Sequence, residues 1–211
     1  MKKILYIPLV LMLFVLVFAG KKYVLGNNTK LEYQNGDMIL QTNTSGQGLA
    51  IQLATNSKYT HIGVLFKENN EWMVYEAVQP VQKVTLSEFI LRGENSQYTI
   101  LRLKNDSLVK LDHVTQKMKN YLLKQIDKDY DWVFNWSEEE MYCSELVYKA
   151  YLNAGIKISD TKLLKDYKLS HPIVQAQLKE RYGNNIPLND TMVAPSDIAN
   201  GNRLKVVFDN Y

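Results

Sequence analysis

Residues 141–147 read Met-Tyr-Cys-Ser-Glu-Leu-Val and hold the only cysteine of the chain, Cys143. The apolar spacing after it predicts an amphipathic helix that ends near Asn153, with Gly155 as its left-handed cap. A thiol in the first turn of a helix faces unpaired backbone N–H groups and the positive end of the helix dipole, and both favour the thiolate. Taken alone, a lone cysteine is more often a buried structural thiol, so the nucleophilic interpretation depends on a histidine–glutamate pair elsewhere in the chain.

Two further stretches predict a hairpin that carries an imidazole and a carboxylate. Residues 60–66 and 72–77 are β-prone and flank Lys-Glu-Asn-Asn at 67–70. If all four of these residues form the loop, His61 lies directly opposite Glu76 on one face of the sheet. A two-residue turn shifts the pairing by two and keeps both side chains on that face, whereas a three-residue loop separates them. A carboxylate beside an imidazole fixes its tautomer, so these groups and the thiol are the parts of a cysteine hydrolase.

The remaining patterns predict an α+β domain, in which a small antiparallel sheet is packed with helices. The strand-like runs cover residues 38–40, 98–103 and 206–208. Helical patterns cover residues 49–54 and 85–91, and Ser107 is expected to cap a longer helix whose apolar stripe ends at Leu122. The charged segment 160–185 is expected to form an added surface helix or a lid over the site, starting at Pro172 and ending at Gly183.

Composition limits the classes of protein to which the chain can belong. A length of 211 residues suits one globular domain, and 46% hydrophobic with 22% charged residues argues against disorder. The net charge of +3 falls to +3 − 2 = +1 without Lys2 and Lys3, which is too little for a nucleic-acid partner. A single cysteine cannot form an internal disulfide, so packing must stabilise the fold.

The first 22 residues have the layout of a secretory leader, and residues 23–211 form the predicted domain. Lys2 and Lys3 precede an apolar run over residues 4–19, and Val17-Phe18-Ala19 suits a cleavage site. The alternative is an uncleaved signal anchor that associates the protein with a membrane, because residues 4–20 are just long enough to span it. Both interpretations predict an exported domain.

The sequence lacks the motifs of several other enzyme classes. It contains no His-Glu-x-x-His, no cysteine pair for zinc, no Gly-x-Ser-x-Gly, and no phosphate-binding or dinucleotide glycine loop. We therefore expect neither a metal nor an organic cofactor. His113 and His171 are interpreted as surface histidines.

The motifs together resemble the YiiX/YebB-like cysteine hydrolases, the circularly permuted papain-type branch of the NlpC superfamily. Five stretches, in the family's order, carry the resemblance: residues 35–39, 57–64, 75–77, 129–134 and 142–147. Residues 195–198 give a looser match. Thr60 stands where a serine before the histidine is frequent in the family. The segment 160–185 matches no motif of the family.

The resemblance implies a circularly permuted papain-like fold and assigns roles to individual residues. Cys143 would be the nucleophile, His61 the general base and later acid, and Glu76 the orienting carboxylate. The oxyanion would meet backbone N–H groups at the helix start, including that of Cys143. Tyr142, Tyr130 and Asp37 are the further candidates for oxyanion or substrate binding.

The expected activity is hydrolysis of an amide bond through an acyl-enzyme on Cys143. A cell-wall peptide, a small peptide and an N-acylated amine are all open as substrates. Two alternatives also stay open: a lipid acyl hydrolase or acyltransferase of the same fold, and an exported binding module without turnover.

Overall fold

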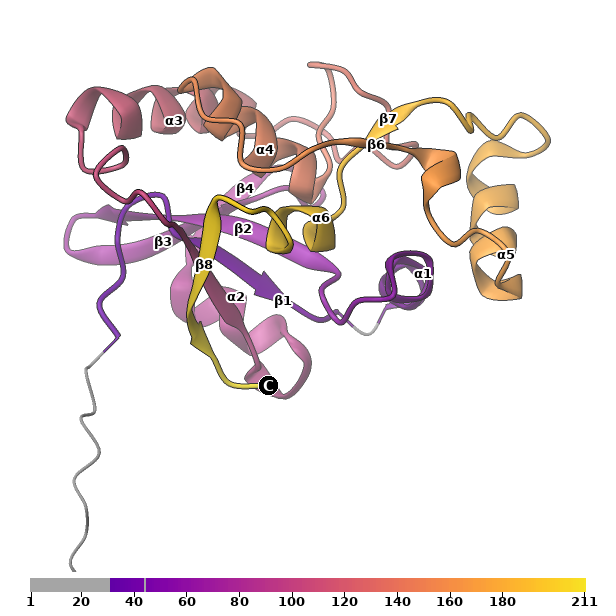
Figure 1. Ribbon diagram of the computed structural model, residues 1–211, viewed down its shortest axis with the longest axis horizontal. Coiled ribbons are helices and arrows are strands. Elements are labelled where there is room, and N and C mark those ends of the chain that lie inside the picture. Colours follow the sequence, from indigo (N-terminus) through magenta and orange to yellow (C-terminus); the bar gives the residue numbers. More distant parts are fainter. Residues whose placement is uncertain (1–30, 44) are drawn as a thin grey trace, which may run out of the picture. The chain divides into compact units, whose positions relative to one another are not determined.

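The computed structural model describes residues 31–43 and 45–211, and within them an antiparallel six-stranded sheet carries helices on both faces (Figure 1). The strand order is β4-β3-β2-β1-β5-β8. The strands are β1 (Met38–Gln41), β2 (His61–Glu68), β3 (Glu71–Glu76), β4 (Gln82–Thr85), β5 (Thr99–Leu103) and β8 (Leu204–Asp209). The helices are α1 (Gly46–Thr55), α2 (Leu86–Arg92), α3 (Asp112–Gln125), α4 (Cys143–Asn153), α5 (Pro172–Tyr182) and α6 (Pro195–Ala199). The α+β class with a small antiparallel sheet is confirmed.

The predicted leader over residues 1–22 lies outside the described residues. Within the part of the chain that the structure describes, no helix combines the length and the apolar character needed to cross a bilayer.

The register of the β2–β3 hairpin places His61 and Glu76 diagonally. The hairpin closes through a two-residue turn at Asn69 and Asn70, whose φ angles are 47° and 67°. Asparagine tolerates this left-handed region, and a turn of this hand matches the twist of the strands. Glu76 therefore pairs with Gly63, two residues beyond His61. The directly opposed placement was wrong, and the two-residue alternative is the one observed.

Gly63 allows a close approach of β3 and α2 to β2. A Cβ atom at this position would lie 2.4 Å from Cγ1 of Val74 and 3.4 Å from Cε2 of Phe89. The absence of a side chain lets Phe89, which α2 provides, come close to the sheet next to His61. The Phe89 and His61 rings stack with centroids 5.5 Å apart and an interplanar angle of 21°. Packing thus fixes the plane of the imidazole.

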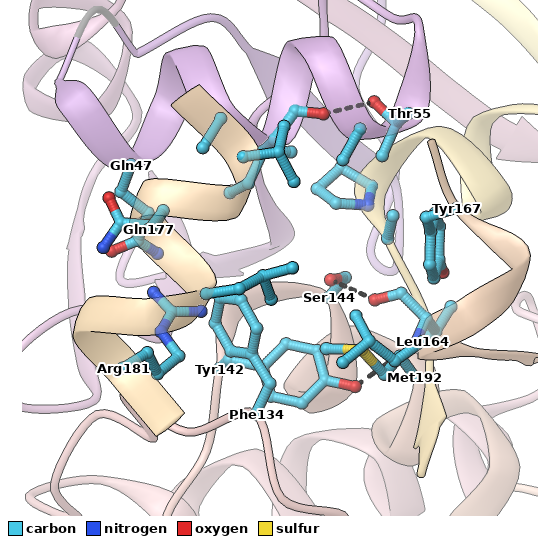
Figure 2. Close-up of a pocket in the computed structure, with 18 of the residues that line it drawn as sticks. Gln47, Thr55, Phe134, Tyr142, Ser144, Leu164, Tyr167, Gln177, Arg181 and Met192 are labelled. Carbon is cyan, nitrogen blue, oxygen red and sulfur yellow. Dashed lines mark hydrogen bonds between the residues drawn. The ribbon is translucent and has the colours of Figure 1, made fainter. Parts of the chain in front are cut away.

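Helix α5 lies beside α1, at one side of the sheet (Figure 1). It starts at Pro172 and is followed by Gly183 at a φ of 60°, as the sequence predicted. Two short strands, β6 (Lys162–Leu163) and β7 (Thr191–Met192), pair with each other and flank the segment that carries it. Helices α1 and α5 both line a pocket (Figure 2), so the segment 160–185 forms a wall of it.

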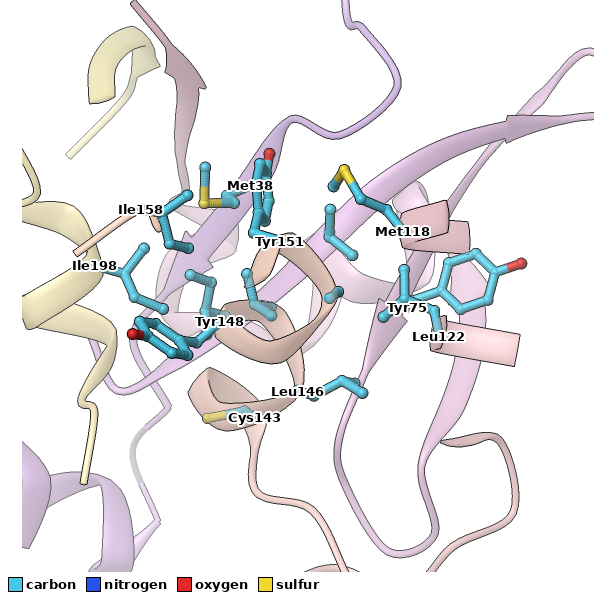
Figure 3. Packing of buried hydrophobic residues seen from close by; sticks show 14 of the residues in the cluster. Met38, Tyr75, Met118, Leu122, Cys143, Leu146, Tyr148, Tyr151, Ile158 and Ile198 are labelled. Atoms are coloured by element: carbon cyan, nitrogen blue, oxygen red, sulfur yellow. The ribbon is translucent and has the colours of Figure 1, made fainter. Parts of the chain in front are cut away.

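Helix α4 is the centre of the larger hydrophobic core (Figure 3). Its buried stripe runs along Leu146, Val147, Ala150 and Tyr151, and it packs against β2 and α3. The helix starts at Cys143 and ends at Asn153, and Gly155 follows at a φ of 82°, which confirms the predicted bounds. The helix is buried from Cys143 to Tyr151, which holds it in one orientation on the sheet, and this orientation fixes where its first residue lies.

The helix predicted to start at Ser107 begins later, at Asp112. The Ser107 hydroxyl donates a 2.5 Å hydrogen bond to the side chain of Asn105, so it does not cap a helix. Residues 107–110 form turns in which Val109 is buried and Leu108 is exposed, the reverse of the expected stripe. The downstream part of the stripe, Val114, Met118 and Leu122, is buried as predicted.

Candidate active site

Cys143 is the first residue of α4, and its side chain is almost fully buried. The first N–H groups of a helix have no acceptor within the helix, and they concentrate its positive potential there. Residues 138–140, three glutamates just before the helix, are all exposed. Their charges are therefore screened by water, which weakens their effect on the sulfur.

His61 and Glu76 form a buried hydrogen-bonded pair. Nε2 of His61 lies 2.7 Å from Oε2 of Glu76, whose side chain has no exposure to water. Burial alone raises the pKa of Glu76, but His61 and Arg92 outweigh it and hold that pKa below its ordinary value. The carboxylate is thus ionised, as a group that orients an imidazole must be.

The second ring nitrogen of His61 is left for Cys143. Because Nε2 is bound to Glu76, Nδ1 is the ring nitrogen that is left for a second partner, and Cys143 is close enough to act on the pKa of this ring. Burial lowers the pKa of His61, but Cys143 and Glu76 together outweigh burial and raise it from 6.5 to about 9. The imidazole is therefore influenced by the Cys143 side chain as well as by the Glu76 carboxylate to which it is bonded.

Sequence reasoning missed the two residues that hold the far side of Glu76. Arg92, from the last turn of α2, makes an ion pair with Oε1 of Glu76, and Gln82 from β4 donates to the same oxygen at 3.0 Å. The Arg92 guanidinium also lies over the Phe89 ring, 5.7 Å from its centroid. Neither residue belongs to a motif, so the sequence carries no signal for them. Their role follows only from the approach of α2 and β4 to β3.

Tyr130 is buried, and it lines the same pocket as Cys143. Its oxygen accepts a 2.9 Å hydrogen bond from Nε2 of Gln47 in α1. Burial raises the pKa of Tyr130, and the neighbouring Cys143 raises it further, so the phenol keeps its proton. A phenol whose lone pair is already used by Gln47 has its O–H available as a donor. Gln47 was not among the sequence candidates.

Tyr142 and Asp37 are placed differently from Tyr130. The Tyr142 hydroxyl accepts a 3.2 Å hydrogen bond from the backbone N–H of Val193, and its ring lies 5.0 Å from that of Phe134 in the pocket (Figure 2). Asp37 binds Arg102 through two 2.7 Å contacts. It follows Gly36, whose carbonyl accepts from Tyr151 near the far end of α4. The fold therefore brings Tyr142, but not Asp37, to the Cys143 end.

A buried ion pair lies in the first two turns of α4. The carboxylate of Glu145 is fully buried and lies 2.8 Å from Nζ of Lys149, and it accepts a long hydrogen bond of 3.5 Å from the N–H of Tyr142. Burial raises the pKa of Glu145 to about 7, although Lys149 opposes this shift. Lys149 also pairs with Glu138 at 2.9 Å. Its cation balances the acidic charge that lies closest in sequence to the thiol.

The other histidines stay outside this constellation. His113 is exposed on α3, and His171 caps α5 by accepting from the N–H of Ile173 at 3.2 Å. Across residues 31–43 and 45–211, no three His, Cys, Asp or Glu side chains are grouped so that they could hold a metal ion.

Comparison with known proteins places this geometry in a family. Residues 32–208 match the family described as permuted papain-like amidase enzymes, YaeF/YiiX, C92. The chain is 42% identical to uncharacterized protein YiiX of Escherichia coli K12, over 82% of this chain and 85% of the relative. It also superposes on a crystal structure titled as metalloprotein yiiX from Escherichia coli O157:H7. That match has a TM-score of 0.81 and 40% identity, over 86% of this chain and 99% of the other.

The family match covers nearly the whole described chain, and the relatives are covered over most of their own length. The resemblance that the sequence motifs suggested is thereby confirmed, with its permuted order of His and Glu strands before the Cys helix. The chain belongs to the permuted papain-like amidases of the YaeF/YiiX family, which are cysteine hydrolases.

Proposed function

We propose that the protein is an exported amidase that cleaves its substrate through a Cys143–His61–Glu76 triad. The 2.7 Å hydrogen bond between His61 and the fully buried Glu76 carries this proposal. A carboxylate is costly to bury, and this one is bonded to an imidazole whose pKa is raised by the only cysteine of the chain.

The reaction begins with attack of the Cys143 sulfur on the carbonyl carbon of the amide. The C–N bond then breaks, and the His61 imidazolium transfers its proton to the departing nitrogen, leaving a thioester on Cys143. In the second step His61 takes a proton from water, and the resulting hydroxide attacks the thioester. The products are a free amine and a carboxylic acid, and the thiol is regenerated.

The oxyanion formed in both steps needs donors on the side of the carbonyl oxygen. We assign this role to the backbone N–H of Cys143, at the helix start, and to the Tyr130 hydroxyl. The support for Tyr130 is its hydrogen bond from Gln47, which turns the phenol proton away from Gln47. Two fixed donors in a buried pocket are worth several kcal/mol in related reactions.

The first test replaces the carboxylate of the triad. Glu76→Gln should lower kcat/KM on a panel of peptide and N-acyl amides of aminomethylcoumarin by about tenfold or more, because a neutral amide stabilises the imidazolium less. His61→Ala should also slow labelling of Cys143 by iodoacetamide near neutral pH. Glu71→Gln, an exposed glutamate on the same strand, is the control. Full activity of Glu76→Gln would remove Glu76 from the mechanism.

A second prediction concerns the alkaline limb of the pH profile. The pKa of His61 is raised from 6.5 to about 9, so the imidazolium that protonates the leaving group is present below pH 9 and lost above it. We expect kcat/KM to fall as the pH rises through about 9, and to fall at a lower pH in Glu76→Gln, which lacks the carboxylate charge. A limb near 6.5 in the unmodified protein would contradict the ion-paired histidine.

A third prediction tests the tyrosine donor. Tyr130→Phe should lower kcat by about tenfold to a hundredfold with little change in KM, because the lost hydrogen bond forms fully only with the oxyanion. Tyr121→Phe is the matched control, since that hydroxyl donates to Glu138 at 3.0 Å and does not line the pocket. A variant that raises KM and leaves kcat unchanged would argue for substrate binding by Tyr130.

Export is proposed from the leader pattern of residues 1–22. Fractionation of cells that produce the full chain should place the domain outside the cytoplasm. Its mass should match either loss of residues 1–19 or an intact, membrane-bound chain. Recovery of the intact chain in the soluble cytoplasmic fraction, with Lys2→Glu and Lys3→Glu variants behaving identically, would refute export.

A further inference from the structure

Arg92 reaches the proposed triad from the face of the sheet opposite to the one that carries Cys143. Helix α2, which ends at Arg92, packs on the smaller hydrophobic cluster, whereas α4 belongs to the larger one (Figure 1). The guanidinium pairs with Oε1 of Glu76, and His61 occupies Oε2 of the same carboxylate at 2.7 Å. One buried carboxylate therefore has a permanent cation on one oxygen and a titrating ring on the other.

The end of α2 is fixed by contacts with the end of β1. The backbone N–H of Glu94 donates to the carbonyl of Thr42, just beyond β1, at 3.0 Å. A Cβ atom at Gly93 would lie 2.7 Å from Oε1 of Gln41, so the glycine permits this close approach. These contacts place Arg92 beside the carboxylate independently of the ion pair that it makes there.

A carboxylate shared in this way attracts the His61 proton less than a free carboxylate would. His61 and Arg92 both lower the pKa of Glu76, because each stabilises its charged form. Since like charges repel, the permanent charge of Arg92 also disfavours a second cation on the imidazole. Glu76 raises the pKa of His61, and a residue that neutralises part of the Glu76 charge opposes that rise.

Charged groups act on the imidazole and its carboxylate from three elements. Cys143 of α4 and Glu76 of β3 raise the pKa of His61. Arg92 of α2 opposes them by way of Glu76. The other polar side chains around this group are Gln41 of β1 and Gln82 of β4, which are neutral, and Glu88 of α2, which is exposed and caps its own helix. Arg92 is therefore the cation that balances the Glu76 charge when His61 is neutral.

The strength of the imidazolium as an acid matters because an amine is a poor leaving group. The C–N bond of the acyl-enzyme precursor breaks as His61 gives its proton to the nitrogen. A phenolate, by contrast, leaves an ester without a proton. If Glu76 faced His61 without a cation on its other oxygen, the imidazolium would hold its proton more tightly and would transfer it to nitrogen more slowly.

We infer that Arg92 is a positioning residue that adapts the triad to amides: it occupies one oxygen of Glu76 and thereby limits how tightly His61 holds the proton that the leaving amine must receive. This inference rests on the proposed amidase reaction. It names the residue that suits the triad to a nitrogen leaving group, and this residue belongs to no sequence motif.

The first test measures the pKa of His61 by NMR titration of its ring nitrogens in the full chain, and it needs no substrate. The signal is assigned by its absence from His61→Ala. Arg92→Met should raise this pKa from about 9 by about one unit, because a cation beside the carboxylate is removed. Arg92→Gln, which keeps donors for Oε1 but carries no charge, should raise it similarly, and Arg92→Lys should restore the original value.

Arg203→Met is the matched control for this titration, because it removes an exposed arginine that precedes β8. It should leave the pKa of His61 unchanged. An unchanged pKa in both Arg92→Met and Arg92→Gln would overturn the inference, and so would a shift of equal size in Arg203→Met.

The second test compares an amide and an ester of one carboxylic acid, the para-nitroanilide and the para-nitrophenyl ester. Near neutral pH, Arg92→Met should lower kcat/KM for the nitroanilide about threefold or more and leave kcat/KM for the ester within about twofold. Arg92→Lys should return the ratio of the two values to that of the unmodified protein. A ratio that is the same in Arg92→Met and in the unmodified protein would overturn the role in leaving-group protonation.

The two tests together separate this inference from the proposed function. If the unmodified protein cleaves the nitroanilide while the Arg92 variants change neither the His61 titration nor the ratio, the inference fails and the amidase proposal stands. If the unmodified protein cleaves neither substrate, the amidase proposal fails, and the titration alone decides whether Arg92 controls the His61 proton.

Discussion

The constraint on which the site depends is the burial of the Glu76 carboxylate. A carboxylate without exposure to water keeps its charge only if cations and donors surround it. Three different elements supply them: His61 from β2, Arg92 from α2 and Gln82 from β4. The hairpin turn sets the register that brings Glu76 to His61, and Gly63 lets α2 close onto the sheet. The hairpin turn, Gly63 and the ion pair with Arg92 are therefore all needed to place the Glu76 side chain.

The helix that carries Cys143 also has a buried carboxylate close to the site. Its start must face the imidazole while an acidic residue, Glu145, lies two positions away in its first turn. Lys149 holds that carboxylate at 2.8 Å, one turn further along the same buried helix. The charge beneath the thiol is thereby balanced within the protein, and the helix dipole is left to act on the sulfur. Packing of α4 against β2 and α3 keeps this arrangement at the end of the sheet.

Residues for the chemistry and residues for the pocket come from different parts of the chain. The family motifs supply the proposed triad, in which His61 lies on β2, Glu76 on β3 and Cys143 on α4. The pocket beside Cys143 is lined by apolar residues of α1 and of α5, and the segment that carries α5 contains no family motif. A division of this kind allows the reaction to be kept while the bound group changes with the helices around it.

Much of the fold was predictable because its signals are local. The bounds of α4 followed from apolar spacing and a glycine cap, and those of α5 from Pro172 and Gly183. The helix after residue 107 was misplaced because the Ser107 hydroxyl bonds to Asn105, and a sequence pattern does not record which partner a hydroxyl takes. The length of the hairpin loop could not be decided from the sequence, so neither the register nor the shared face of His61 and Glu76 was settled before the structure showed a two-residue turn.

The sequence by itself determined the chemical groups and their family, since residue types and their order along the chain are local information. Tertiary structure decided what those groups touch. The contacts of Arg92 and Gln82 with Glu76, the bond from Gln47 to Tyr130 and the pairing of Asp37 with Arg102 all join residues that no motif connects. Each depends on how elements distant in sequence approach one another, and burial then fixes the partner because an unpaired buried polar group is too costly.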